Sequence, residues 1–280
     1  MIKMTLGMAI LAVFVSQLAA AQDPSLPHSS ASSEAPLPDD PNQFHLFVLA
    51  GQSNMAGRGK VEPIDTELDP RVLMLDKAKR WVPARDPLHF DKPSVVGVGV
   101  GRTFAIAYAD AHPGVTVGLV PTAVGGSPII AWQPGGYHDQ TQTHPWDDCQ
   151  SRMQQAMKSG VIKGVLWHQG ESDANQGSAP KYEARLHALV ERFRTTVGDP
   201  KLPFIAGQLG QFEDRPWDEL RHQIDAAHRA LPEQLSNCGF VSSTGLKHRG
   251  DNVHFDAASL REFGRRYYQS YVSLTTNDSR

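Results

Sequence analysis

The chain has only two cysteines among its 280 residues, so no more than one disulfide can form. The fold cannot depend on the dense disulfide framework that small exported domains use. Whether Cys149 and Cys238 pair is left open, because linear spacing does not show how far apart their α-carbons lie.

The sequence also lacks the usual metal-binding motifs. It contains 12 histidines, but no His-Glu-x-x-His motif and no cysteine–histidine cluster. His168 with Glu171, or Asp251 with His254, could still supply metal ligands. We nevertheless expect neither a metal nor a cofactor.

Neither excess charge nor a second long apolar run is present. The net charge is -3, so the chain has no basic field to attract nucleic acid, and we expect no nucleic-acid partner. After residue 21 no segment approaches the roughly 20 apolar residues that a membrane-spanning helix needs. A hydrophobic content of 40% is ordinary for a globular protein.

The N-terminus has the pattern of an export signal. A short positive start with Lys3 precedes an apolar stretch from Leu6 to Leu18, and small residues follow at 19–21. No cysteine follows, which excludes a lipoprotein anchor, whereas an uncleaved N-terminal anchor remains the alternative. We predict a signal peptide over residues 1–21, a secreted or periplasmic location, and no membrane contact after cleavage.

The rest of the chain divides into a linker, one domain and a short tail. Residues 22–43 are rich in proline and serine and show no apolar periodicity, which favours a flexible linker. The domain is predicted over 44–274, with a tail at 275–280. No internal repeat or second linker occurs, and the sequence leaves the oligomeric state open.

Within the domain, strand and helix patterns alternate. Buried strands are predicted at 44–50 and 115–120, and further strands at 71–76, 164–167, 203–209 and 240–243. Helices are predicted at 102–112, 147–158, 182–193 and 217–231, with Pro216 in a first turn and Asp256 capping a final helix. Residues 81–94 are predicted to be irregular. This alternation predicts an α/β fold, a three-layer α/β/α sandwich around a central, mostly parallel five-stranded sheet.

One predicted strand ends in a turn that carries a hydroxyl group. The apolar run Phe44–Ala50 stops at Gly51, and Ser53 follows in a loop that also contains Gly57 and Gly59. Open α/β sheets bind ligands at the carboxyl ends of their strands. Polar clusters at 125–127 and 168–171 also follow strands, so all three should meet at one edge of the sheet. Ser53 is therefore the candidate nucleophile.

A second glycine-rich stretch, Gly97–Gly101, invites a dinucleotide-binding interpretation. Arg102 stands where the third glycine of G-x-G-x-x-G belongs, which argues against a nucleotide site. We expect these glycines to let the loop pass close to the Ser53 turn.

A serine nucleophile needs a base and a group that orients it. His254 is the best candidate base, and Asp251 lies three residues before it. On a turn or first helical coil such a pair points the same way, so the carboxylate can hold one ring nitrogen while the other faces Ser53. The alternative is a surface Asp-x-x-His pair at a helix start.

The serine is not part of a G-x-S-x-G nucleophile elbow, because Met55 replaces the second glycine. Four motifs in order instead resemble the SGNH (GDSL-like) hydrolases, in their sialate O-acetylesterase and acetylxylan esterase branch (carbohydrate esterase family 6-like). The motifs are Gly51-Gln52-Ser53-Asn54-Met55, Gly125-Gly126-Ser127, His168-Gln169-Gly170-Glu171-Ser172-Asp173 and Asp251-x-x-His254-Phe255. Together they span the domain from residue 44 to about 270.

The resemblance implies a role for each block. Ser53 looks like the nucleophile, with its own N–H as one oxyanion donor. Gly126 looks like the second donor, although Gly125 is the alternative. Most SGNH members use an asparagine as the third donor, and here Gln169 would take that place through its side-chain amide. His254 looks like the base.

The orienting acid has two candidates. Asp251 matches the family's acid, whereas Glu171 is a supporting or alternative acid that could act in its place or together with it. Glu171 could equally be a structural carboxylate that ties the third block to the first.

Several further residues are candidates for binding substrate: Gln52, Asn54, Trp132 and His168. Trp132 lies with Tyr137, His138 and Trp146 in a loop-like stretch suited to a sugar platform, and core packing is the alternative for each.

The resemblance thus implies an esterase that removes O-acetyl groups from carbohydrate through an acetyl-enzyme intermediate. Acetylxylan or a similar acetylated glycan is the expected substrate. The alternatives are a sialate O-acetylesterase or other short-chain ester hydrolase, and a non-catalytic carbohydrate-binding protein on the same fold.

Overall fold

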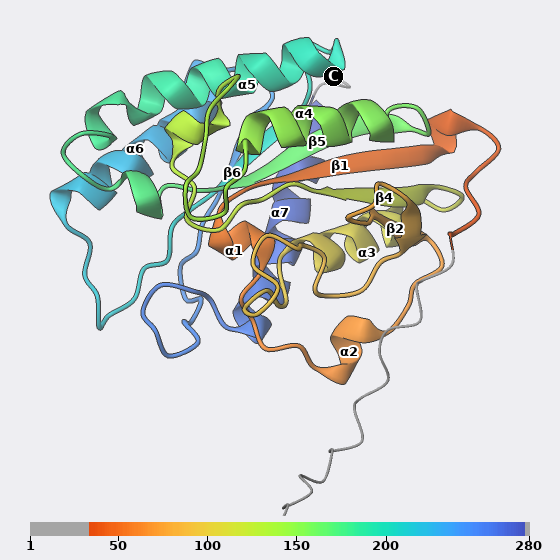
Figure 1. The fold of residues 1–280 in the computed structure, drawn as a ribbon, viewed down its shortest axis with the longest axis horizontal. Helices are drawn as coiled ribbons and strands as arrows, with labels where there is room; N and C mark the ends of the chain where they lie inside the picture. The colour runs from red at the N-terminus through yellow and green to blue at the C-terminus, as the bar shows by residue number, and fades with distance from the viewer. Residues whose placement is uncertain (1–33, 278–280) are drawn as a thin grey trace, which may run out of the picture. The chain divides into compact units, whose positions relative to one another are not determined.

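A seven-stranded sheet runs through residues 34–277, the part of the chain that the computed structural model describes (Figure 1). The strand order is β3-β2-β4-β1-β5-β6-β7, and every pair is parallel except β2 with β3. The strands are β1 (Phe44–Gly51), β2 (Val72–Leu75), β3 (Trp81–Pro83), β4 (Thr116–Pro121), β5 (Val161–His168), β6 (Phe204–Gly207) and β7 (Cys238–Val241). The predicted α/β class with a mostly parallel sheet is confirmed.

The predicted number of five strands is wrong. The strand missed altogether is β3, which lies in the proline-broken segment expected to be irregular and pairs antiparallel with β2. Trp81 and Val82 are buried there, and Pro83 ends the strand. Because β3 is an edge strand, a proline at its end removes no hydrogen bond from the sheet interior.

Helices connect the strands. They are α1 (Ser53–Ala56), α2 (Pro63–Thr66), α3 (Gly101–Ala111), α4 (Pro145–Ala156), α5 (Tyr182–Val197), α6 (Glu219–Gln234) and α7 (Ala257–Asn277), with 3-10 turns η1 (Pro41–Gln43), η2 (Ile129–Trp132), η3 (Glu171–Asp173) and η4 (Ala179–Lys181). All five predicted long helices are present. Asp256 caps α7 as predicted, since its Oδ1 accepts a hydrogen bond from the Ser259 N–H at 2.7 Å. Pro216 is not in the first turn of α6, because Asp218 caps that helix two residues later.

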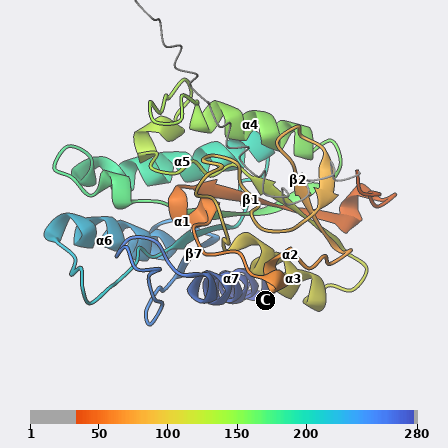
Figure 2. The same ribbon diagram turned by 60° about the horizontal axis from the view of Figure 1, so that its bottom comes forward.

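The helices cover the sheet on both faces. Leu46 and Val48 of β1 belong to a core that includes α4, α5 and α6, whereas Phe47 and Leu49 belong to a second core with α3 and α7. Figure 2 shows these two groups of helices above and below the strands. Because strand side chains alternate between faces, a strand buried on both sides must be apolar at nearly every position, as β1 is. The predicted three-layer sandwich is confirmed.

The central strand brings the polar loops together. The Gln52 N–H donates to the His168 oxygen at 2.8 Å, and the Val124 N–H donates to the Gly51 oxygen at 2.9 Å. Gly51 has φ 130°, and a Cβ there would lie 2.1 Å from the His168 oxygen, so only glycine permits this crossing. The loops after β1, β4 and β5 therefore meet at one edge, as predicted.

The glycine-rich stretch before α3 also lies where it was expected. The Gly97 N–H donates to the Gly57 oxygen at 3.1 Å, and Gly59 and Val98 form an antiparallel bridge. A Cβ on Gly97 would lie 2.0 Å from the Gly59 oxygen. These glycines thus allow close contact with the segment that follows Ser53.

The ends of the domain extend slightly beyond the predicted bounds. The Ala35 N–H donates to the Trp81 oxygen at 2.9 Å, so part of the predicted linker contacts the domain, and α7 continues to Asn277. The predicted signal peptide lies outside the described residues. Within 34–277, no helix has both the length and the apolar character needed to cross a membrane.

Both cysteines are free and buried. Burial raises the pKa of the Cys149 thiol to about 12 and that of Cys238 to about 11. Since the thiolate is the reactive form, both groups should be inert in the folded protein.

We therefore predict that a thiol reagent such as Ellman's reagent reacts with two thiols per chain in denaturant and with none in the native protein. The measurement is the absorbance of the released chromophore in each condition. A chain that shows no free thiol even in denaturant, and two after reduction, would carry a Cys149–Cys238 disulfide instead.

Candidate active site

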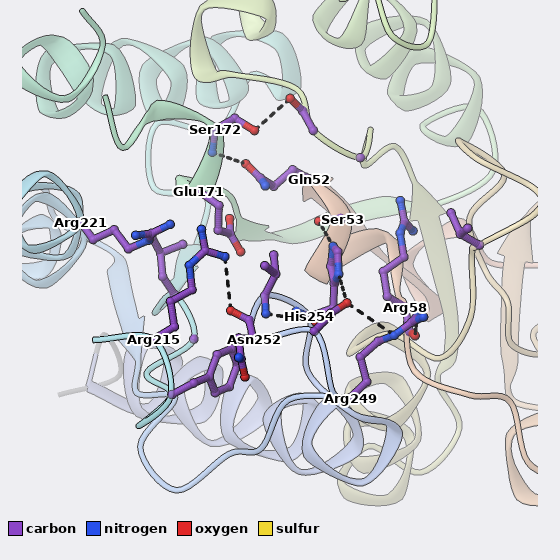
Figure 3. A pocket seen from close by; sticks show the side chains of 18 of the residues that line it. Gln52, Ser53, Arg58, Glu171, Ser172, Arg215, Arg221, Arg249, Asn252 and His254 are labelled. Atoms are coloured by element: carbon purple, nitrogen blue, oxygen red, sulfur yellow. Dashed lines mark hydrogen bonds and ion pairs between the residues drawn. The ribbon is translucent and has the colours of Figure 1, made fainter. Parts of the chain in front are cut away.

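A cavity of about 450 Å³ opens at the edge of the sheet where the three loops meet (Figure 3). Ser53 lies at the start of α1, directly after β1, and is 6% exposed. Gly126 and Glu171 come from the loops after β4 and β5. The rest of the wall comes from segments around residues 209–221 and 249–254 and from Arg58, Lys92 and Val95.

Ser53 and His254, 201 residues apart in sequence, are in contact in this cavity. The His254 Nε2 lies 3.0 Å from the Ser53 Oγ (Figure 3). The His254 Nδ1 lies 2.7 Å from the Asp251 Oδ2. The other carboxylate oxygen accepts hydrogen bonds from the backbone N–H groups of His254 at 2.8 Å and Val253 at 3.0 Å. The turn that these bonds hold points both side chains the same way, as the three-residue spacing predicted.

The charge of Asp251 sets the roles of the two ring nitrogens. Partial burial raises its pKa, but hydrogen bonds from the backbone and imidazole of His254 and from the Val253 N–H outweigh burial and hold it at about 2. The group is therefore ionised near neutral pH and can only accept hydrogen bonds. The His254 Nδ1 must then donate to it, which leaves the Nε2 free to accept the Ser53 proton.

Glu171 lines the same cavity but does not hydrogen-bond to His254. Its Oε1 accepts from the Asn54 Nδ2 at 2.8 Å, and its Oε2 is buried without a partner among the described residues. Of the two candidate acids, the structure thus places Asp251 against the imidazole. Asn54 also donates to the Val253 oxygen at 3.1 Å and accepts from the Phe255 N–H at 3.1 Å, so this fully buried side chain joins the nucleophile loop to the histidine loop. Its predicted role in binding substrate is wrong.

Two residues that line the cavity have backbone N–H groups available as donors. Those of Ser53 and Gly126 have no hydrogen-bond partner among residues 34–277. The Gly125 N–H, in contrast, donates to the Asp91 Oδ2 at 2.7 Å. Between the two glycines considered from the sequence, Gly126 is therefore the one with a free donor.

Gln169 does not lie in the cavity, and its predicted oxyanion role is wrong. The side chain is fully buried; its Nε2 donates to the Ser127 oxygen at 3.1 Å and to the Asp173 Oδ2 at 2.5 Å, so both amide hydrogens are used. The Tyr182 hydroxyl donates to the Gln169 Oε1. Gln52, predicted to bind substrate, does line the cavity, and its Oε1 accepts hydrogen bonds from the backbone N–H groups of residues 170 and 172.

The other predicted binding residues also lie elsewhere. His168 and Trp132 are fully buried: the Nε2 of His168 faces the Gln208 oxygen at 3.0 Å, and the Nε1 of Trp132 donates to the Ser127 Oγ at 2.9 Å. Trp146 is a core residue as well. Trp132 and Trp146 belong to the hydrophobic core that includes α4 and α5, where they bury the apolar faces of these helices.

The residues that the sequence did not reveal are mostly cationic. The cavity wall contains Arg58, Lys92, Arg215, Arg221 and Arg249, against only two carboxylates, and also the aromatic side chains of Phe212 and Trp217. The signal that was missed is the Arg-Pro-Trp sequence at 215–217, where Trp217 was assigned to a helix but precedes α6 in a loop.

These cations differ in how firmly they are paired. Arg58 is bound to Asp91 at 2.7 Å. Arg215 has only a 3.5 Å hydrogen bond to the Asn252 oxygen, and Arg221 reaches Asp218 at 3.6 Å. In Figure 3, Arg215 and Arg221 lie together on one side of Glu171, and Arg58 and Arg249 lie on the far side of the Ser53–His254 pair.

Chemically, the arrangement has a hydroxyl in contact with an imidazole, an ionised carboxylate on the other side of that imidazole, and two unpaired N–H groups on residues that line the same cavity. These are the components of acyl transfer through a serine. Within residues 34–277, no cluster of three or more histidine, cysteine, aspartate or glutamate side chains could hold a metal ion.

Comparison with known proteins identifies the family. Residues 43–273 match the family model described as carbohydrate esterase, sialic acid-specific acetylesterase. A "Probable carbohydrate esterase" of Arabidopsis thaliana is 32% identical over 261 residues, which cover 86% of this chain and 93% of that protein. Its X-ray structure superposes with a TM-score of 0.72 at 31% identity, covering 84% of this chain and 99% of the plant chain.

Two more distant structures share the fold. The crystal structure of NanS matches with a TM-score of 0.67 at 18% identity, covering 85% of this chain and 99% of NanS. A carbohydrate acetylesterase from Xanthomonas citri matches with a TM-score of 0.63 at 22% identity, covering 83% of this chain and 57% of that one. The family match and the plant relative confirm the resemblance drawn from the four motifs: this chain belongs to the carbohydrate esterase family of sialic acid-specific acetylesterases.

Proposed function

We propose that this carbohydrate esterase is an exported serine esterase that removes O-acetyl groups from acetylxylan or a similar acetylated glycan. The observation that carries the proposal is the chain of contacts from the Ser53 Oγ through His254 to the ionised Asp251. Export is proposed from the sequence pattern of residues 1–21 alone.

The proposed reaction starts with attack by the Ser53 oxygen on the acetyl carbonyl carbon while the His254 Nε2 takes the hydroxyl proton. The tetrahedral oxyanion accepts hydrogen bonds from the N–H groups of Ser53 and Gly126. As the C–O bond to the sugar breaks, the protonated His254 Nε2 gives its proton to the departing sugar oxygen, which leaves as a hydroxyl. Water, activated by the same imidazole, then attacks the acetyl-enzyme and releases acetate and free Ser53.

The character of the cavity favours a polar substrate. Most of its lining side chains are charged or polar, whereas a long acyl chain requires an apolar trough. Trp217 is partly exposed at this wall, and its Nε1 donates to the Gly210 oxygen at 2.7 Å, which holds the ring in place. A fixed indole ring beside polar groups suits the face of a sugar.

A second candidate substrate is an O-acetylated sugar that carries a carboxylate, such as a sialic or uronic acid. The supporting observation is the weak pairing of Arg215 and Arg221, two guanidinium groups that could bind a carboxylate through paired N–H donors. Acetylxylan without acidic substituents offers no such group.

The first test addresses the nucleophile. Ser53→Ala should abolish acetate release from p-nitrophenyl acetate and abolish covalent labelling by a fluorophosphonate, with the far-UV circular dichroism unchanged, because the attacking oxygen alone is lost. Ser273→Ala, at an exposed position on α7, is the control and should behave as the wild type. Unchanged activity in Ser53→Ala would reject the assignment, and absence of both labelling and acetate release in the wild type would favour a non-catalytic carbohydrate-binding protein.

A second test separates the two carboxylates. Asp251→Asn should lower kcat by about 10³- to 10⁴-fold, because an amide cannot stabilise the imidazolium that forms during attack. Glu171→Gln should cost much less, since Glu171 contacts Asn54 rather than the imidazole. Steady-state kinetics of both variants provide the measurement, and a larger loss in Glu171→Gln would make Glu171 the orienting acid.

A third test distinguishes the substrates by a panel of acetylxylan, O-acetyl sialic acids and acetylated pectin. If the carboxylate candidate is correct, Arg215→Gln and Arg221→Gln should each raise KM about 10-fold or more for acidic substrates, the loss expected for a charge-assisted hydrogen bond, and leave p-nitrophenyl acetate hydrolysis unaffected. Arg265→Gln on α7 is the control for loss of one surface charge. Equal KM changes for neutral and acidic glycans would exclude carboxylate recognition and favour acetylxylan.

A further inference from the structure

We propose that the buried ion pair between Arg58 and Asp91 positions the peptide group that binds the oxyanion, so that both are positioning residues for the reaction. The inference rests on the proposed function, because it concerns how the Gly126 N–H is held relative to Ser53. Neither side chain was singled out by the four sequence motifs.

A single carboxylate oxygen connects the two halves of the site. The Asp91 Oδ2 accepts a hydrogen bond from the Arg58 Nη2 at 2.7 Å and another from the Gly125 N–H at 2.7 Å. The side chains of Arg58 and Asp91 are only 4% and 2% exposed. Because both are withdrawn from water, these contacts are not weakened by competing solvent.

The peptide that carries the free Gly126 N–H is held on both sides. The Gly125 N–H, on the peptide group before it, donates to Asp91. The Gly126 oxygen, on the peptide group after it, accepts from the Ser172 Oγ at 2.9 Å. With both neighbouring peptide groups held, the peptide between them has little freedom to rotate, and its N–H stays directed to one place.

Arg58 extends the same network to the nucleophile. Its Nη1 donates to the Gly57 backbone oxygen at 2.7 Å, and the Gly57 N–H donates in turn to the backbone oxygen of Ser53 at 3.0 Å. The Arg249 Nη1 donates to the Arg58 oxygen at 2.8 Å, from the loop that carries Asp251. Arg58 and Asp91 thus connect the nucleophile, the oxyanion donor and the acid loop by short contacts.

The glycine at 125 is required for this contact. A Cβ on Gly125 would lie 2.3 Å from the Arg58 Nη2 and 2.7 Å from the Asp91 Oδ2, too close for any side chain. Gly126 has φ 84°, in the region that favours glycine. The double glycine therefore allows the carboxylate to approach the backbone at one residue and turns the chain at the next.

The arginine also compensates an unfavourable charge. Burial raises the pKa of Asp91, but the charge of Arg58 and its hydrogen bond hold the pKa below its usual value, so the carboxylate is ionised. A negative charge one peptide away from the developing oxyanion would oppose the reaction. Arg58 neutralises that charge while it leaves the carboxylate able to accept from Gly125.

The test compares Asp91→Ala with a matched buried aspartate. Asp65 is also 2% exposed, also pairs with an arginine (Arg261, 2.7 Å) and also accepts a backbone N–H (Glu62, 2.8 Å), but its partners, unlike Arg58 and Gly125, do not line the cavity. Asp65→Ala is therefore the control for the general effect of removing a buried ion pair.

Asp91→Ala should lower kcat on p-nitrophenyl acetate by about 10- to 1000-fold, the range up to full loss of one oxyanion donor. KM should change by less than about threefold, because ground-state binding of this small ester does not use the oxyanion donor. The affinity for a boronic acid that forms a tetrahedral adduct with Ser53 should fall with kcat/KM. Asp91→Asn should recover part of the loss, because its amide oxygen can still accept from Gly125.

Asp65→Ala should keep kcat per folded molecule even where its thermal stability falls as much as that of Asp91→Ala. If Asp91→Ala does not fold, Gly125→Ala in the native background tests the same contact by displacing the carboxylate, with the same expected kcat loss. Equal kcat in the Asp91 and Asp65 variants, or an effect on KM alone, would overturn the positioning role while leaving the proposed esterase intact. A wild-type chain without acetate release or labelling would instead overturn the proposed function, and this inference with it.

Discussion

The pairing of β1 with β4 on one side and β5 on the other is the constraint on which the site depends. Neighbouring parallel strands end at the same edge of the sheet, so the loops that follow these three strands lie next to one another. The backbone bonds from Gln52 to His168 and from Val124 to Gly51 continue this pairing one step beyond the strands. The hydroxyl and the two free N–H donors are therefore placed by the sheet itself rather than by flexible loops.

The histidine reaches this edge by a different route. The loop before α7 carries Asp251 and His254, and α7 is packed on the face of the sheet opposite α4, α5 and α6. Asn54 accepts a hydrogen bond from the Phe255 N–H and donates one to the Val253 oxygen. The nucleophile loop is therefore hydrogen-bonded to the histidine loop on both sides of His254. The buried Asn54, expected to bind substrate, has this structural role instead.

Two ionised carboxylates support the site: Asp251 in the cavity wall, and the buried Asp91, which holds the Gly125 N–H. Asp251 and Asp91 are held ionised by hydrogen bonds or by an arginine, and each acts on a neighbouring group rather than on the substrate. Arg215 and Arg221 have only weak partners and line the same cavity. A site that must stabilise a developing negative charge benefits from this positive balance.

Much of the fold was predictable, because the patterns that specify it are local. Alternating strand and helix periods predicted the sandwich, and glycine-bounded apolar runs located β1, β4, β5 and β6. Only the short edge strand β3 was not predicted, because three residues that end in proline are too few to show the alternation of apolar and polar residues typical of a strand. The start of α6 was misplaced because Pro216 and Asp218 are both acceptable at a helix start, and the capping hydrogen bond decides between them.

The amino-acid sequence by itself determined the alternation of strands and helices, the strand-end serine turn and the Asp-x-x-His turn, because each depends on residues close together in the chain. The tertiary structure brought Ser53 and His254, 201 residues apart, into contact. Only the tertiary structure decided which way the polar side chains point. Gln169 and Trp132 turn inward because buried partners on other elements satisfy their polar atoms, whereas Gln52 and Trp217 remain at the cavity. These partners lie 4 to 42 residues away in the chain, and residue types alone do not show which of these side chains the fold buries together.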